Sequence, residues 1–401
     1  MSVQTPPSTT TDERLISPTF VLIVVAAIAY FTSLSMLLPV LPRYVEDTLD
    51  GDGLAIGVVV GAFAVSAALV RPLVGRLGDQ FGRRPLAVFG AALAALSMAG
   101  YGLVESLPIL VGFRLLTGLG EGAFFIGAAT AAQDLSPDDR RGEAASFFSI
   151  SIYGGLAIGP FLGEVLYRSA GAGRVWIVAA VLAGAASLLS LLIPADLGRH
   201  EADPDQPDGN RRLLHPAAIM PGTVLLLGLM GFAAFGSFLT VFLDDLGFED
   251  AGPYFLVYGL TVLVVRIFGA RVPDRFGAVR TATASLLAIT AGTLLIATVA
   301  SEPGLYAGTV VFSIGMSLLF PALFSLVVNQ APASERSHAV GTFSLFFDMS
   351  QGLGAPLLGI GVDVFGTDRA AFIGGAAFAV GGLVLARTRL AGMVARTEAD
   401  A

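Results

Sequence analysis

Twelve long stretches of mostly apolar residues follow one another along the chain, separated by short polar segments. They begin near residues 18, 53, 85, 107, 144, 174, 217, 252, 280, 304, 338 and 370. A helix needs about 20 mostly apolar residues to cross a hydrocarbon layer roughly 30 Å thick. Because each stretch has about this length, the pattern predicts an all-α membrane protein with twelve transmembrane helices.

One polar interval is much longer than the others and divides the pattern in two. Residues 196–216 are rich in Asp, Pro and Gly, a composition typical of a flexible linker. Six apolar stretches lie in residues 18–195 and six in residues 217–388, so two six-helix bundles are expected. Residues 1–17 and 389–401 are predicted to be polar tails.

The arginines are distributed unevenly between alternate loops. If all twelve stretches cross the membrane, both tails and every second loop lie on one side. That side carries sixteen arginines: Arg14, Arg76, Arg83, Arg84, Arg140, Arg141, Arg199, Arg211, Arg212, Arg271, Arg275, Arg280, Arg336, Arg387, Arg389 and Arg396. The opposite loops carry four: Arg43, Arg168, Arg174 and Arg369. Because basic residues are enriched in cytoplasmic loops, we expect a multi-pass protein of the plasma or inner membrane with both termini in the cytoplasm.

The composition excludes several classes of function. Of the 401 residues 55% are hydrophobic and 13% are charged, which is too few charges for the surface of a soluble domain. The chain has no cysteine and three histidines, so neither disulfides nor a metal site is expected. The net charge of −8 argues against a nucleic-acid partner. No Walker-type loop and no pair of nucleophile and base is found, so we expect no cofactor and no enzymatic activity.

The two halves of the sequence repeat each other. A shift of 195 residues aligns Arg71 with Arg266 and Asp79 with Asp274. The same shift aligns Phe81 with Phe276, Gly82 with Gly277, Gly120 with Gly315 and Pro137 with Pro332. Parallel repeats of six helices are typical of secondary transporters that bind their substrate between the halves. Arg71 and Arg266 lie near predicted helix ends, where snorkelling toward water is the favoured interpretation.

The segment between the second and third helices combines glycines with charges. It reads Gly75-Arg76-Leu77-Gly78-Asp79-Gln80-Phe81-Gly82-Arg83-Arg84-Pro85. This resembles the signature loop of the major facilitator superfamily, and the resemblance covers residues 18–390. The glycines, Gly75 and Gly82 among them, permit a tight turn. The resemblance implies that the charges latch a cytoplasmic gate: Asp79, Arg83 and Arg84, with Asp274 and Arg275 as a shorter copy in the second half.

Three helices resemble those of drug-efflux-like proton antiporters within that superfamily. The first helix ends in Pro39-Val40-Leu41-Pro42, and the fourth carries Arg114 three residues before Thr117. The fifth contains the antiporter-like positions Gly155, Gly159, Pro160 and Gly163. Small residues permit close helix packing, and proline removes a backbone donor and kinks a helix. Glu164, where that motif has glycine, is expected near the outer helix end, in reach of water.

Ionisable side chains within the apolar stretches are candidates for proton coupling, because burying a charge in a membrane costs at least ~2.5 kcal/mol. Asp348 lies near the middle of the eleventh helix, and a shift of 196 aligns it with Ile152. We expect Asp348 to load and release a proton, with a structural acid as the alternative. Arg114 and Glu121 on the fourth helix are expected to modulate it. Alternatively, those two residues satisfy each other or backbone carbonyls.

Several side chains are weaker candidates for lining a substrate cavity. They are Tyr30, Phe124, Phe235, Phe347 and Gln351. Phenylalanine is common on surfaces that face lipid, so for a single Phe that role is the simpler interpretation. Gln351 lies one turn beyond Asp348 and is the better polar candidate.

The leading hypothesis is proton-coupled export of a small amphipathic or cationic compound by alternating access, performed by a monomer in the lipid bilayer. The alternative is proton-coupled uptake or facilitated transport of a sugar, an organic acid or an amino acid. A third possibility is a transporter fold retained as a sensor or scaffold. Charges that occur in the membrane part of only one half argue against this third function.

Overall fold

The computed structural model describes residues 17–136, 141–195, 197, 214–248, 250–269, 271–332 and 335–390. These residues form helices and, within the described ranges, no strand. Eleven helical segments among them are long and apolar enough to cross a membrane. The all-α character expected from the apolar stretches is therefore confirmed.

One of the eleven segments contains two crossings. The helix α6 (Arg141–Ser190) has 50 residues, which at 1.5 Å per residue is far longer than one crossing requires. Inside it, Gly171 has a φ angle of 73°, a left-handed conformation that glycine adopts without steric cost. The helix is interrupted at this residue, and crossings before and after it bring the total to twelve.

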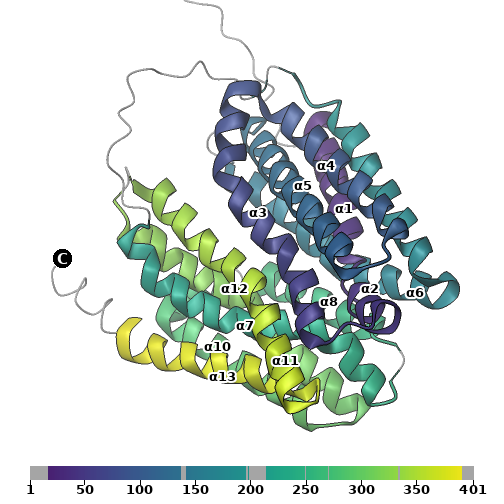
Figure 1. Ribbon diagram of the computed structural model, residues 1–401. Coiled ribbons are helices and arrows are strands. Elements are labelled where there is room, and N and C mark those ends of the chain that lie inside the picture. The colour runs from purple at the N-terminus through teal and green to yellow at the C-terminus, as the bar shows by residue number, and fades with distance from the viewer. Residues whose placement is uncertain are drawn as a thin grey trace, which may run out of the picture.

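The twelve crossings form two bundles (Figure 1). The first contains α1 (Pro18–Ser35), α2 (Val40–Arg43), α3 (Gly53–Phe81), α4 (Arg83–Gly100), α5 (Leu107–Asp134) and α6. The second contains α7 (Pro216–Asp245), α8 (Gly252–Gly269), α9 (Val272–Phe276), α10 (Ala278–Thr298), α11 (Glu302–Gln330), α12 (Arg336–Phe365) and α13 (Arg369–Leu385). In Figure 1 the first bundle runs from purple to blue and the second from green to yellow, with α3 and α12 side by side between them.

The helix starts follow from local side chains. Ser17 accepts a hydrogen bond from the backbone N–H of Phe20 at 3.1 Å, and Asp52 accepts one from Ala55 at 2.8 Å. Such caps satisfy N–H groups that the first helical turn leaves without partners. The first crossing is interrupted between α1 and α2, just before Pro39-Val40-Leu41-Pro42, because proline cannot donate a helical hydrogen bond.

The tight turn expected from the glycine-rich loop is present in both halves. Gly82 ends α3 with a φ angle of 90°, and Gly277, its partner in the repeat, ends α9 with a φ angle of 85°. Residues with a Cβ atom are strained in this region. The repeated glycines therefore serve to reverse the chain at equivalent points of the two bundles.

The antiporter-like positions on α6 lie against the backbone of α1. A Cβ atom added at Gly159 would lie 2.0 Å from the Ser35 hydroxyl oxygen, and one at Gly163 would lie 2.2 Å from the Met36 carbonyl oxygen. The Ser35 hydroxyl also donates to the Gly155 carbonyl oxygen at 2.7 Å. Small residues on α6 thus allow the two helices to approach closely, as expected from their type.

We expect Gly159→Leu to separate α1 from α6 and to lower the thermal stability of the purified protein. Overpacking a close contact costs about 1–3 kcal/mol. Gly154→Leu is the matched control, because a Cβ atom at Gly154 meets nothing within 4 Å. Equal melting temperatures for the two variants would contradict this account of the packing.

Candidate functional site

Two ends of the molecule must be distinguished before the site is described. We call the end at which α1 and α7 begin the linker side, because residues 196–216 connect the bundles there. The opposite end, at which α1 ends and α3 begins, is the far side. Contacts between the two bundles lie mainly toward the far side and in the middle of the crossings.

Two pairs of helices join the bundles. Along α3 and α12 the backbones touch: a Cβ atom at Gly57 would lie 2.4 Å from the Ala355 carbonyl oxygen, and one at Gly61 would lie 2.6 Å from that of Gly352. On the other interface a Cβ atom at Gly259 of α8 would lie 2.3 Å from Cα of Ala157 on α6. These contacts hold the bundles together without occupying the linker side.

Three charged side chains, one each from α3, α5 and α12, meet near the interface of the two bundles. The Arg71 guanidinium of α3 contacts the Asp348 carboxylate of α12 at 2.9 Å, between Nη1 and Oδ2. It also lies 3.8 Å from Oε2 of Glu121 on α5. Both acids are buried, and Oε2 of Glu121 has no hydrogen-bond partner. One arginine therefore lies between two acids, one from each bundle.

This arrangement corrects the interpretation of Arg71. Snorkelling toward water was the favoured role, but its guanidinium contacts Asp348 and Glu121 and stands over the Phe125 ring, 5.2 Å from its centre. The pair of Asp348 and Glu121 was expected, whereas their shared partner was not. Burying these charges in the membrane costs less free energy when they are paired than when each is buried alone.

Arg114 has different neighbours from those expected. Its Nε–H donates to the Val59 carbonyl oxygen at 3.0 Å, and its guanidinium stands over the Phe63 ring at 4.7 Å. Neither contact involves Glu121 or Asp348. These contacts match the alternative in which a backbone carbonyl satisfies Arg114. They do not support a direct role of Arg114 beside the two acids.

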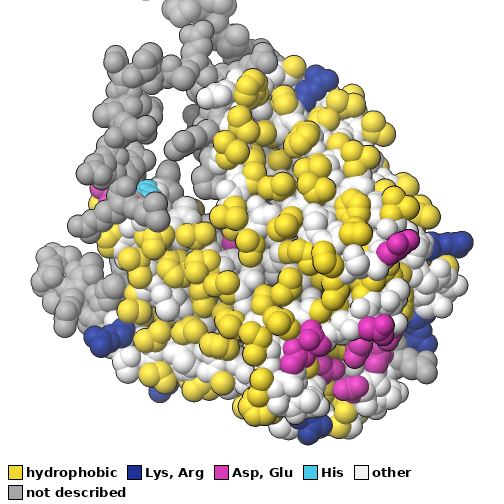
Figure 2. Space-filling model, in the orientation of Figure 1, with side chains coloured by type: hydrophobic (Ala, Val, Ile, Leu, Met, Phe, Trp, Pro, Cys, Tyr) yellow, Lys and Arg dark blue, Asp and Glu magenta, His cyan; other side chains and the backbone are white. Residues whose placement is uncertain are grey.

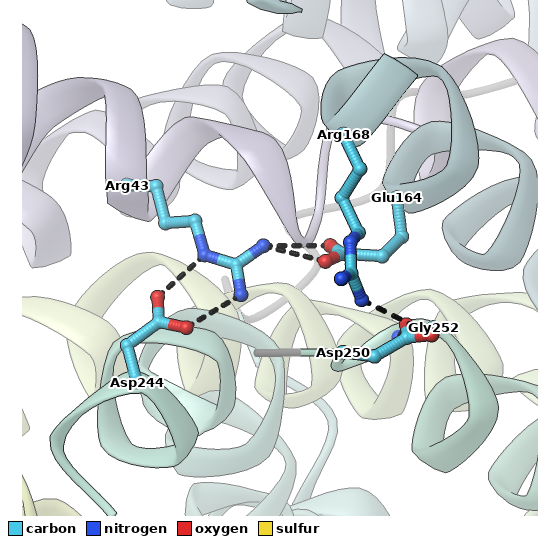
Figure 3. A network of polar contacts seen from close by, with 6 residues as sticks. All are labelled: Arg43, Glu164, Arg168, Asp244, Asp250 and Gly252. Atoms are coloured by element: carbon cyan, nitrogen blue, oxygen red, sulfur yellow. Dashed lines mark hydrogen bonds and ion pairs between the residues drawn. The ribbon is translucent and has the colours of Figure 1, made fainter. Parts of the chain in front are cut away.

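A second charged network closes the far side (Figure 3). Arg43, the last residue of α2, donates to both oxygens of Glu164 on α6, at 2.7 and 2.8 Å. The same guanidinium donates to Asp244 of α7 through Nη2, at 2.7 Å, and through Nε. Arg43 therefore connects the first bundle, to which it belongs, with the second. Nearby, Arg168 and Asp250 form another contact between bundles at 3.4 Å.

The network also corrects the expected position of Glu164. It was expected to reach water, yet only 1% of its surface is exposed.

The two charged contacts between the bundles on the far side differ in their exposure to water. The side chains of Arg168 and Asp250 are 44% and 48% exposed. Arg43 is buried, whereas its partner in the other bundle, Asp244, is 38% exposed. Exposed ion pairs contribute about 0–1 kcal/mol and breaking a buried one costs about 3–5 kcal/mol, so of these two contacts between the bundles we expect the one made by Arg43 to contribute more.

Carboxylates gather beside this network on the far side, as Figure 2 shows by their magenta colour. Asp363 of α12 accepts the backbone N–H groups of Gly53 and Leu54, at 2.8 and 2.9 Å, and so caps α3 of the other bundle. Burial, with the neighbouring carboxylates of Asp245 and Glu46, raises the pKa of Asp368 from 3.8 to about 7. Asp245 and Asp368 belong to the second bundle and Glu46 to the first, so closing the far side brings Glu46 toward the other two acids.

The predicted gate residues lie on the linker side, and the structure describes only some of their side chains. Arg83 pairs with Asp134 at the end of α5, at 3.0 Å between Nε and Oδ2. Arg84 is half-buried and Arg275 is exposed. Gly75 lies within the helix α3, before the turn at Gly82, and the side chains of Asp79 and Asp274 fall outside what the structure describes. The latch between Asp79 and Arg83 therefore stays a prediction.

Three of the expected cavity residues are instead packed inside their own bundles. Tyr30 and Phe124 are fully buried and stack with ring centres 3.9 Å apart. Phe235 is buried against Phe312, with ring centres 5.2 Å apart. These rings fill the cores of the two bundles, where stacking keeps their aromatic surface away from water. Their assignment to a cavity is not supported by this conformation.

Phe347 and Gln351 on α12 are better placed, since both are half-buried. The Gln351 amide donates to the Ser350 hydroxyl at 3.2 Å. A separate pocket of about 420 Å³ lies where α6, α8 and α11 meet. Its polar lining residues are Ser149, Tyr153, Arg266 and Ser317. None of these four residues was predicted to line a cavity.

Two bundles of six crossings, joined by paired helices and by ion pairs, form the architecture of a secondary transporter. A model of the Major Facilitator Superfamily matches residues 23–301 and again residues 254–398. The chain belongs to this superfamily.

Known proteins similar to this chain are transporters of several kinds. The uncharacterized MFS-type transporter STM4428 of Salmonella typhimurium is 30% identical over 82% of this chain and 86% of its own. Multidrug resistance protein 1 of Bacillus subtilis is 26% identical over 82% and 85%. A structure of the nucleoside transporter NupG has a TM-score of 0.71 at 17% identity, and the match covers 94% of this chain and 99% of NupG. The human organic anion transporter MFSD10 has a TM-score of 0.68 at 19% identity, with 92% and 100% covered. The last two likenesses concern the fold.

Proposed function

We propose that the chain exports a small amphipathic compound in exchange for protons, as a monomer, by alternating access. The observation that carries this proposal is Arg71 lying between Glu121 and Asp348 at the contact of the two bundles. A group that gains and loses a proton at this contact can couple ionisation to the relative movement of the bundles. The superfamily membership supports transport of a small molecule across a membrane.

The contacts of Arg71 suggest how protonation of Asp348 would affect the two bundles. A proton on Asp348 removes the negative charge that holds Arg71 to α12, at 2.9 Å. Arg71 then has Glu121 as its remaining acid, 3.8 Å away and with one carboxylate oxygen free of hydrogen bonds. The guanidinium can move to the first bundle alone, which weakens the contact between α3 and α12. Protonation and separation of the bundles are linked by this step.

Export is the direction we propose because the sequence resembles antiporters in α1, α5 and α6, and because the small residues of α6 lie against α1. A multidrug resistance protein stands among the similar sequences. The arginine distribution supports a cytoplasmic position of the linker side. The conformation described here, closed by Arg43 on the far side, would then be the state closed to the outside.

Transport by the purified protein in liposomes with an imposed pH gradient tests this proposal. A panel of amphipathic compounds would be screened for movement against a concentration gradient, with the internal or the external side acidified in turn. We expect at least one compound to move opposite to the proton gradient. Movement of every transported compound in the direction of the protons would instead indicate symport and uptake.

The proposed sidedness gives a prediction about labelling. Gln80, in the last turn of α3, and Glu105, between α4 and α5, are exposed near opposite ends of α4. The chain has no cysteine, so a single cysteine is labelled without background. We expect a membrane-impermeant thiol reagent outside intact cells to label Glu105→Cys and to leave Gln80→Cys unlabelled until the cells are opened. The reverse pattern would refute the proposed topology.

The raised pKa of Asp368 gives a prediction about pH. Because Glu46 belongs to the other bundle, part of this rise should be lost when the bundles separate, and a carboxyl group whose pKa is higher in the closed state than in the open state disfavours closure once it ionises. Closure should therefore gain population as the pH falls from about 7 toward 4. We expect distances between spin labels across the far side to shorten over this range. The change should be smaller in Asp368→Asn, and an equal change in both proteins would contradict the role of Asp368.

A further inference from the structure

Two arginines related by the sequence repeat have different surroundings. Arg71 of α3 contacts the Asp348 carboxylate across the interface with α12, at 2.9 Å. Arg266 of α8 stands over the Tyr153 ring of α6, across the other interface, 4.0 Å from the ring centre. Tyr153 precedes Asp348 by 195 residues, the same shift that relates the two arginines. The contacts thus place Tyr153, rather than Ile152, opposite to Asp348 in the repeat.

Arg266 therefore lacks the counter-charge that Arg71 has. Within the described part of the chain it forms no ion pair, and its buried Nε–H has no hydrogen-bond partner. The polar groups that share its pocket are the hydroxyls of Tyr153, Ser149 and Ser317. The Ser317 hydroxyl already donates to the Val262 carbonyl oxygen at 3.2 Å. Arg266 is half-buried and its Nε–H is shielded from water, so a ligand that supplies an anion would offset the cost of burying that group.

The rest of the pocket is apolar. Its volume is about 420 Å³, and its walls are formed by Ile150, Leu263, Ile267, Leu318 and Pro321. These residues come from α6, α8 and α11, so both bundles contribute to the pocket. An apolar space with one unpaired cation at its edge suits a molecule with an apolar body and an anionic group. A carboxylate can accept two parallel hydrogen bonds from a guanidinium.

We propose that Arg266 binds the anionic group of an amphipathic ligand in this pocket. The inference deepens the proposed export function, because it selects an amphipathic anion over a cation as the substrate class. The same chemistry is offered by an anionic lipid of the surrounding bilayer. The binding experiment below separates these two sources.

Binding to the full-length protein in phosphatidylcholine nanodiscs tests the proposal without any pH gradient. The probes are radiolabelled 1-naphthaleneacetate and dodecanoate at neutral pH, each with its amide as an uncharged competitor. We expect each carboxylate to bind saturably and at least about 10-fold more tightly than its amide, the scale of one charge-assisted hydrogen bond. Absence of this preference for both probes would overturn the proposal.

Two kinds of variant test the residue assignment. Arg266→Gln should weaken carboxylate binding about 10-fold or more and leave amide binding nearly unchanged. Tyr153→Asp should do the same, because it supplies Arg266 with the counter-charge that Asp348 supplies to Arg71, and it should bind the carboxylates more weakly than Tyr153→Asn. Arg387→Gln, at an exposed arginine outside the pocket, is the control for lost positive charge. Unchanged preference in both Arg266→Gln and Tyr153→Asp would also overturn the proposal.

Adding phosphatidylglycerol to the nanodiscs identifies the source of the anion. If phosphatidylglycerol competes with both probes and this competition requires Arg266, the pocket binds lipid. If phosphatidylglycerol does not compete, the pocket binds a soluble amphiphile. Either result upholds the anion site. The binding experiment uses no gradient, so the two claims can fail separately. Anion binding without proton-driven transport would contradict the proposed function alone. Proton-driven transport without a preference for anions would contradict this inference alone.

Discussion

Asp348→Asn should abolish transport driven by a pH gradient and leave exchange of the compound across the membrane without a gradient. Asparagine has nearly the same volume as aspartate and imitates its protonated form permanently. In this variant Glu121 is the acid left in contact with Arg71 among the described residues, so the proton no longer decides to which bundle Arg71 binds. We expect the gradient-driven rate to fall at least 100-fold, measured as accumulation in liposomes.

Two further variants separate coupling from folding. Asp348→Glu should keep part of the gradient-driven activity, because a proton site remains at a shifted position. Glu302→Gln removes an exposed carboxylate in the first turn of α11 and should behave as the unmodified protein. If Asp348→Asn accumulates the compound as fast as the unmodified protein does, Asp348 is structural and Glu121 is the next candidate.

Arg43→Gln should open the far side. Glu164 and Asp244 would then face each other without the cation between them, and Glu164 is almost completely buried. Leaving such a charge unpaired costs about 3–5 kcal/mol, whereas water can reach it once the bundles separate. The population closed on the far side should fall by about 100-fold or more relative to the open one.

Spin labels at Asp47→Cys and Glu302→Cys, one on each bundle, measure this change as a longer distance on the far side. Combining Arg43→Gln with Glu164→Gln should recover part of the closed population, because the unpaired buried charge is gone. Arg168→Gln removes the exposed pair with Asp250 and should change the distance little. A distance in Arg43→Gln like that of the unmodified protein would show that another contact closes the far side.

Much of the fold follows from the sequence, because crossing a membrane imposes a length and a polarity on each helix. The twelve apolar stretches and the repeated glycines predicted the crossings and the turns at Gly82 and Gly277. Asp348 and Glu121 were found because charge in an apolar stretch is rare. They were therefore candidates for proton coupling before their neighbours were known.

The partners of these charges could not be predicted in the same way. Arg71 lies near the end of an apolar stretch, where snorkelling is common, and only the crossing of α3 and α12 brings it to Asp348. Arg43 and Asp244 lie at helix ends that are 201 residues apart in sequence, and nothing local connects them. The burial of Tyr30 and Phe235 depends on how each bundle packs, which hydrophobicity alone does not specify.

The position opposite Asp348 gave a different kind of error. Aligning the repeats by their prolines gave Ile152, whereas the contact of Arg266 with Tyr153 gives the neighbouring residue. A difference of one residue turns a helical side chain by about 100°. The sequence repeat alone therefore could not indicate that Arg266 has a hydroxyl-bearing ring where Arg71 has an acid.

Proton movement in liposomes loaded with a fluorescent pH indicator tests the central claim most directly. A compound found in the transport screen would be added outside, with no pH gradient imposed, and the change in internal pH would be recorded with the uptake of the labelled compound. The account predicts proton movement opposite to the compound in the unmodified protein, and exchange without proton movement in Asp348→Asn. Proton movement of equal size in both proteins would contradict it.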